Sequence, residues 1–214
     1  MQNESKKPKQ TSEILESVVR EKDTDQVTIG ELVEALHERG FGVLMALAAL
    51  PLCIPAPAPP GYTLVFSVPL FVFAAQLIWG SDTPWLPNWI LKRSIKRQFL
   101  ATVIEKAAPW LRRVEAILKP RLQFAVTRTG ERVIGIFAFI FAISVALPIP
   151  IPLTNLLPGV GVLVMSLGLL SRDGLVILSG MAVGMVGIII LVVAVYAGSE
   201  AAFALIHWMG DLFE

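Results

Sequence analysis

The chain has 214 residues, of which 55% are apolar and 16% charged, whereas ordinary soluble domains are about 45–50% apolar and about 25% charged. This apolar excess excludes an intrinsically disordered chain. The single cysteine, Cys53, excludes an internal disulfide framework. No His, Cys or acidic residues recur at metal-ligand spacing, so we expect no metal site and no cofactor.

The charged residues are confined to two stretches of the chain. Of the 18 Lys and Arg, six lie in residues 1–40 and eleven in residues 92–132. Asp82 is the only charged residue of 41–91, and residues 133–214 contain five charges. Two such apolar blocks predict an all-α integral membrane protein. We therefore divide the chain into 1–40, 41–91, 92–132 and 133–214.

Residues 1–40 form the first polar stretch. They lack the apolar core that would directly follow the basic start of a signal peptide, so we expect no cleavable leader. Apolar residues recur there at helical spacing, and Thr28 with Glu31 has the pattern of a capping box. This predicts a polar tail to about residue 10, then two short amphipathic helices. They lie either on the membrane surface or as a lid over the membrane block.

The first apolar block is interrupted by prolines. We expect a helix over Phe41–Leu52, extended or turned backbone over Pro51–Gly61, where five prolines occur, and a second helix over Tyr62–Trp79. The first helix is too short to cross about 30 Å of hydrocarbon, which takes about 20 residues. The block is therefore predicted to be a broken, re-entrant hairpin whose irregular turn is shielded from lipid at membrane depth.

The second apolar block has the same order of features. Ala49–Pro55 aligns with Ala146–Pro152 and Pro60-Gly61 with Pro158-Gly159, and each block then has a polar turn containing aspartate, Asp82 or Asp173. This order indicates an internal duplication. Whether the two hairpins are inverted or parallel stays open, because no apolar span lies between them.

One long transmembrane helix is expected over Leu175–Gly198, a run without charge. Its small residues, among them Gly180 and Gly184, predict close packing either on the hairpins or on a second chain. A short closing helix is expected over Ala201–Leu212. Two short hairpins and one long span leave little protein to cover irregular backbone, so we also expect a homodimer.

Residues 92–132 carry eleven Lys and Arg against three Glu, interleaved with apolar residues at helical spacing. This pattern predicts two amphipathic helices, separated near Pro109 and Pro120, on an anionic lipid surface. Trp85 and Trp89 precede them as an interfacial aromatic belt. The positive-inside rule places this stretch and the N-terminus in the cytoplasm. The apolar stripe and flanking membrane blocks argue against nucleic-acid binding.

Several ordered motifs resemble the ExoD family of bacterial membrane proteins, over roughly residues 28–200. They are the two Ala-Leu-Pro turns, Trp85-Leu86-Pro87, Arg112-Arg113-Val114-Glu115, Pro120-Arg121-Leu122, Asn155-Leu156-Leu157-Pro158 and Gly168-Leu169-Leu170-Ser171-Arg172-Asp173-Gly174. The resemblance implies a bacterial inner-membrane protein linked to exopolysaccharide synthesis and, in some members, to tolerance of alkaline conditions. It implies a phenotype and no mechanism.

Hairpins interrupted at corresponding positions are typical of transporters whose unwound backbone lines a binding site at membrane depth. The candidate substrate-binding residues lie at the two proline turns and at the second acidic turn: Pro55, Pro57, Gly61, Pro150, Pro152, Thr154, Asn155, Arg172 and Asp173. Two structural alternatives remain open. Arg172 and Asp173 would form an exposed turn that starts the next helix, and Asn155 would cap the second limb.

No catalytic motif of a hydrolase, metalloenzyme or nucleotide-binding enzyme occurs, so we expect no enzyme. The favoured function is transport of an anionic or lipid-linked envelope precursor between the two proline turns. One alternative is a membrane scaffold or regulator that docks exopolysaccharide machinery through the basic helices. Another is an ion or proton pathway in alkaline tolerance, which the lack of intramembrane carboxylates disfavours. A water-accessible polar cavity at the turns would favour transport over the scaffold.

Overall fold

The computed structural model describes residues 14, 17, 26–54, 61–118, 121–122, 127–147 and 152–212. Its elements are β1 (Gln26–Thr28), α2 (Ile29–Leu36), η1 (His37–Arg39), α3 (Gly40–Ala49), η2 (Leu50–Cys53), α4 (Tyr62–Trp79), α5 (Asn88–Leu91), β2 (Ser94–Lys96), α6 (Arg97–Ile117), α7 (Arg128–Ala146), α8 (Pro152–Ser171) and α9 (Gly174–Leu212). The fold is mostly helical, as predicted, with one small antiparallel sheet of β1 and β2 that was not expected.

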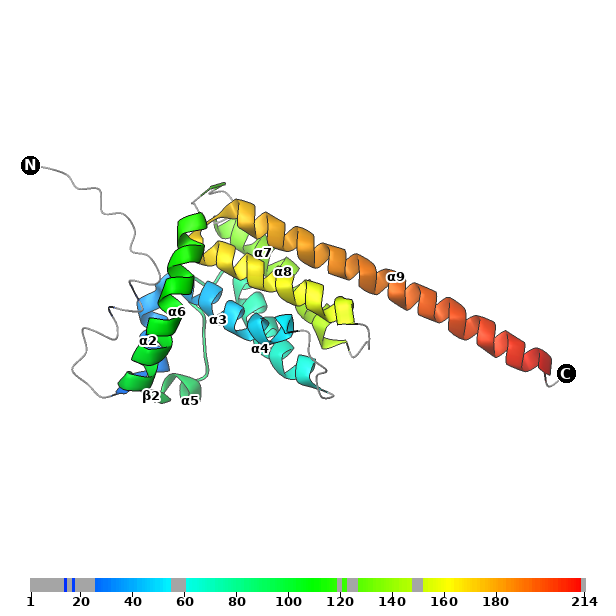
Figure 1. Ribbon diagram of the computed structural model, residues 1–214, viewed down its shortest axis with the longest axis horizontal. Helices are drawn as coiled ribbons and strands as arrows, with labels where there is room; N and C mark the ends of the chain where they lie inside the picture. The colour runs from blue at the N-terminus through cyan, green and yellow to red at the C-terminus, as the bar shows by residue number, and fades with distance from the viewer. Residues whose placement is uncertain are drawn as a thin grey trace, which may run out of the picture.

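Five helices, α3, α4, α7, α8 and α9, run side by side as a bundle (Figure 1). Within the described residues, α4, α7 and the Gly174–Glu200 part of α9 are long and apolar enough to cross a membrane. Gly40–Cys53 and Asn155–Ser171 are apolar but shorter. Each hairpin therefore pairs a helix of spanning length with a shorter one, and the chain has the make-up of a membrane protein. The expectation of one long transmembrane helix was wrong, because α4 and α7 are also of spanning length.

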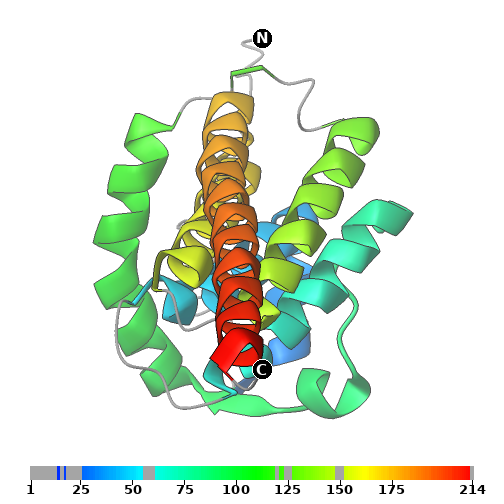
Figure 2. The same cartoon turned by 90° about the vertical axis from the view of Figure 1, so that its right-hand side faces the viewer.

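The two hairpins pack crosswise. The first limb of one lies against the second limb of the other, so that α3 contacts α8 and α4 contacts α7. In Figure 2, α4 and α7 lie together on one side of α9. A Cβ on Gly42 would lie 2.9 Å from the carbonyl oxygen of Ser166, and one on Gly135 would lie 2.9 Å from that of Ala74. Glycine thus permits an equivalent close approach at both crossings.

Helix α9 packs along α8 through its small residues. A Cβ on Gly180 would lie 2.6 Å from the backbone nitrogen of Met165, and one on Gly184 would overlap the Phe141 ring. The prediction that these residues pack within the chain is confirmed. The expectation of a separate closing helix over Ala201–Leu212 was wrong, because α9 continues unbroken to Leu212. The intervening Gly198-Ser199-Glu200 contains no proline to end the helix.

The polar segments gather at one end of the bundle. Thr28 and Glu31 form the predicted capping box at the start of α2. Helix α6 lies across this end instead of along the bundle (Figure 1), with Leu100 and Ile104 buried against Val27. The break expected at Pro109 was wrong, because α6 runs through it. Pro109 is exposed, so its ring meets solvent and the helix loses one backbone hydrogen bond.

The proline turns lie at the other end of the bundle and are only partly described. Leu50–Cys53 forms a 3-10 helix, while Ile54 is extended. Residues 55–60 and 148–151 lie outside the described part. The second turn was expected to reach Gly159, but α8 already begins at Pro152. Proline suits the first turn of a helix, where its missing N–H has no partner to lose. The alignment of Pro158-Gly159, which is helical, with Pro60-Gly61 was therefore wrong in structural terms.

Candidate functional site

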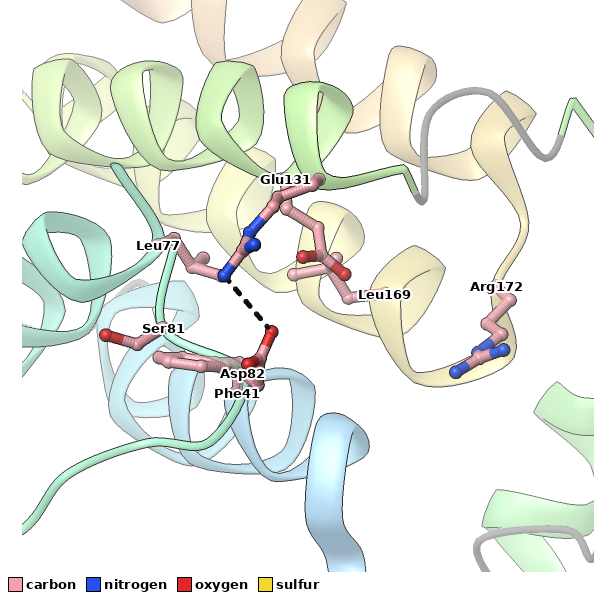
Figure 3. A pocket seen from close by; sticks show the side chains of 8 residues that line it. Phe41, Leu77, Ser81, Asp82, Glu131, Leu169 and Arg172 are labelled. Atoms are coloured by element: carbon pink, nitrogen blue, oxygen red, sulfur yellow. Dashed lines mark ion pairs between the residues drawn. The ribbon is translucent and has the colours of Figure 1, made fainter. Parts of the chain in front are cut away.

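A polar pocket of about 310 Å³ lies at the end of the bundle opposite the proline turns. Its lining comes from both hairpins and consists of Phe41, Leu77, Ser81, Asp82, Arg128, Glu131, Leu169 and Arg172. Figure 3 shows Asp82 and Glu131 near one another, with Arg172 on the far side of the end of α8. The pocket is therefore built where the two second limbs end.

Matching turns end these two limbs. After α4, the N–H groups of Gly80 and Ser81 donate to Leu77 and Gln76 at 3.0 Å. After α8, Arg172 and Asp173 donate to Leu169 and Gly168 at 3.3 and 2.9 Å. Both turns use a left-handed residue, Gly80 with φ 79° and Arg172 with φ 54°, as helix C-termini often do. The two turns thus share a backbone conformation, and both contribute polar residues to one pocket.

Arg128 joins the start of the second hairpin to the end of the first. Its Nη2 donates to the carbonyl oxygen of Gly80 at 3.2 Å and lies 3.8 Å from Oδ1 of Asp82. Because both side chains of this ion pair are mostly exposed, the pair contributes at most about 1 kcal/mol to the stability of the fold. The partly buried Glu131 stands one turn along α7. Two acids and two arginines line the pocket, so the lining has no net charge.

The structure separates the two predicted residues of the second acidic turn. Arg172 is exposed and lines the pocket. Asp173 is buried, with 3% of its surface exposed, and its Oδ1 accepts the N–H of Leu175 at 3.1 Å. Asp173 therefore caps α9, as expected if the turn starts the next helix, but it is buried, whereas that alternative expected an exposed turn.

Asn155 is a different kind of candidate. It lies three residues after Pro152, inside α8, so the alternative that it caps this helix was wrong. Its Oδ1 is buried and has no hydrogen-bond partner among the described residues. Gly159, one turn along the same face, packs against Leu52 of η2, and a Cβ added to this glycine would lie 3.1 Å from that of Leu52. The amide thus lies on the face of α8 that is turned toward the first hairpin.

The other candidates at the proline turns are less informative. Pro55, Pro57 and Pro150 lie outside the described residues. Gly61 is exposed, with φ 85°, and forms the N-cap of α4. Pro152 and Thr154 belong to the first turn of α8, where the structure describes the backbone only. Asn155 and Arg172 are separated by about 25 Å along α8, at 1.5 Å per residue.

The sequence interpretation missed Asp82, Arg128 and Glu131 as site residues. For Glu131 a signal was present, because Glu-Arg-x-x-Gly occurs at 38–42 and again at 131–135. The glycines of this motif are the two that make equivalent contacts at the hairpin crossings. Within the described part of the chain, no group of three His, Cys, Asp or Glu could hold a metal ion.

Comparisons with known proteins agree with the sequence resemblance. The family model described as exopolysaccharide synthesis, ExoD, matches residues 11–193. The chain is 29% identical over 184 residues to Protein ExoD of Rhizobium meliloti, covering 85% of this chain and 76% of that protein. It is 30% identical over 186 residues to the uncharacterized protein slr1875 of Synechocystis, covering 86% of each. No solved structure matches.

Proposed function

The chain belongs to the ExoD family of exopolysaccharide synthesis proteins, and we propose that it is a transporter-like protein of the bacterial inner membrane. Its substrate would be an anionic or lipid-linked precursor of the envelope. The path would follow the interface between the two hairpins, from the charged pocket to the proline turns. Transport fits a family linked to polysaccharide synthesis, because such precursors must cross or leave the membrane.

The observation that carries this proposal is the buried amide oxygen of Asn155, which has no hydrogen-bond partner among the described residues. An unsatisfied buried polar group costs about 1–3 kcal/mol, so a chain built only for packing would place an apolar residue there. The amide lies at one end of the α8 face that contacts the first hairpin, and the charged pocket lies at the other end. Polar features at both ends of one helix interface suit a substrate path.

Crosswise packing of α3 on α8 and of α4 on α7 supports a second part of the proposal, namely that the protein is built from an internal repeat. We take the two hairpins as copies of an internal repeat that starts at each Glu-Arg-x-x-Gly motif. Gly42 and Gly135 then correspond, as do Gly80 and Arg172. The limbs of both copies turn at the same end of the bundle (Figure 1), which favours parallel over inverted repeats. Binding sites of repeat-built transporters lie at the repeat interface.

The pocket end would face the cytoplasm. Helix α6 crosses this end and bears exposed cations, among them Lys106, Arg112 and Arg113. Trp79, Trp85 and Trp89 are 79%, 64% and 67% exposed, as expected of an interfacial aromatic belt. Cations and tryptophans at one end of an apolar bundle suit the cytoplasmic surface, where anionic lipids attract Lys and Arg.

Transport and scaffold hypotheses differ in which charges matter. We expect Arg172→Gln to reduce exopolysaccharide output by about tenfold or more at unchanged protein level, because one charged contact to an anionic substrate, worth about 1.5–3 kcal/mol, is lost. Neutralising Lys106, Arg112 and Arg113 together should lower membrane abundance before it lowers output per molecule. Output in a strain lacking the native gene, normalised to protein in the membrane fraction, measures both effects.

The reverse result would favour the scaffold. If the pocket variant keeps full output and the α6 variant loses it at normal abundance, the basic face of α6 is a docking surface for exopolysaccharide machinery. That alternative has its own support in the exposed cations of α6.

A further inference from the structure

An apolar crevice of about 300 Å³ lies between the first turns of α7 and α9. Its apolar walls are Val133 and Ile134 of α7 with Ile177, Leu178 and Met181 of α9, and Thr127, Thr129 and Gly130 complete its lining. Ile134 and Ile177 are fully buried and form the floor. The crevice is distinct from the charged pocket, although both use the start of α7.

Water is a poor occupant for most of this crevice. A buried water needs two to four polar partners, whereas five of the eight lining residues are apolar side chains. Val133 and Leu178 are 41% and 44% exposed and form its rim. Because α7 and α9 are both of spanning length, this rim would open toward lipid hydrocarbon when both helices cross a bilayer. The chemistry of the walls therefore selects a hydrocarbon chain.

The polar end of the crevice offers contacts to a headgroup. Gly174, at the start of α9, donates its N–H to the carbonyl oxygen of Arg121 at 2.8 Å. This contact anchors the backbone of the exposed Arg121 at the start of α9, whose first turn leads to Ile177 and Leu178. Thr129, in the first turn of α7, is also exposed. An exposed arginine anchored at the start of α9 and a hydroxyl group in the crevice lining supply the charge and the hydrogen-bond donor that a lipid phosphate needs.

We propose that this crevice is a binding site for one anionic phospholipid, with an acyl chain between α7 and α9 and the phosphate beside Arg121. The site goes beyond the proposed transport function, because a scaffold would bind the same lipid. The bound lipid would lie between α7 and α9, which contact each other far less than α8 and α9 do.

Photolabelling of the full chain in nanodiscs tests the site. The probe is phosphatidylglycerol with a diazirine on its acyl chain, and labelled peptides are mapped by mass spectrometry. We expect adducts to concentrate on Val133, Leu178 and Met181. Leu178→Trp, which fills the crevice, should reduce labelling there by about tenfold. The matched control is Ile189→Trp, at a position of α9 that is 57% exposed and outside the crevice; it should leave labelling unchanged.

The headgroup is tested separately with Arg121→Gln and with a phosphatidylcholine probe. Each should reduce labelling of the crevice by several-fold if the phosphate of an anionic lipid lies beside Arg121. Even labelling along α9 in the unsubstituted protein would overturn the proposal without any variant. So would unchanged labelling in Leu178→Trp, or crosslinks showing that a second copy of this chain fills the crevice. None of these readouts depends on exopolysaccharide output, so failure of the lipid site and failure of transport are distinguishable.

Discussion

Gly180→Val is expected to lower the free energy of unfolding by about 3 kcal/mol or more. This is at or above the upper end of the range typical of overpacking. A Cβ at this position would lie 2.6 Å from the backbone nitrogen of Met165 and 2.8 Å from the carbonyl oxygen of Gly161. Because both atoms belong to the α8 backbone, no side-chain rotation relieves the clash. Helices α8 and α9 must separate.

The matched control is Ala182→Val, two residues along α9 on its exposed face. It introduces the same β-branched side chain without meeting α8. Thermal unfolding of both variants in one detergent, followed by circular dichroism, measures the difference. Equal unfolding temperatures for the two variants would show that α9 does not pack on α8 through this face.

Asn155→Leu is expected to abolish most exopolysaccharide output while leaving the protein as stable as before, or more so. Leucine has the same number and branching of side-chain heavy atoms as asparagine but no polar atom. It therefore removes a buried oxygen without a partner among the described residues, and relief of that cost is worth about 1–3 kcal/mol. If the amide binds substrate, function and stability change in opposite directions. If it has a structural partner elsewhere in the chain, both fall together.

The control for this variant is Ser179→Ala. The hydroxyl group of Ser179 is exposed and donates to Val176 of its own helix at 2.7 Å, so its removal should leave output unchanged. Output per membrane protein and the unfolding temperature are measured for both variants. Full output from Asn155→Leu would contradict a role for the amide in substrate binding.

Local features could be predicted well from the sequence. Gly61 and Gly80 flank a run of apolar residues, and α4 has the predicted bounds Tyr62–Trp79. The capping box at Thr28 also forms as its spacing predicts. Where a single proline was taken as a helix break, at Pro109, the prediction failed. One proline costs one hydrogen bond, which the other contacts of a long helix can offset.

The arrangement of the helices could not be predicted in the same way. All bundle helices are apolar around much of their circumference, so periodicity alone does not say which helix meets which. The charged pocket was missed for a related reason. Asp82, Glu131 and Arg172 are far apart in sequence, and crosswise packing of the hairpins brings them together. Among the predicted residues, Asp173 caps α9 as its alternative interpretation stated, while Asn155 does not cap α8.

The most direct test of a substrate path between the hairpins is whether water reaches position 155. In a Cys53→Ser background, Asn155→Cys would be exposed to a small charged thiol reagent in intact cells and in inverted membrane vesicles. Met165→Cys is the control, because Met165 is 0% exposed and contacts Gly180 of α9, away from the face that meets the first hairpin. The proposed path predicts rapid modification at 155, from at least one side, and none at 165. Absence of modification at 155 from both sides would mean a dry, packed interface and would contradict the path.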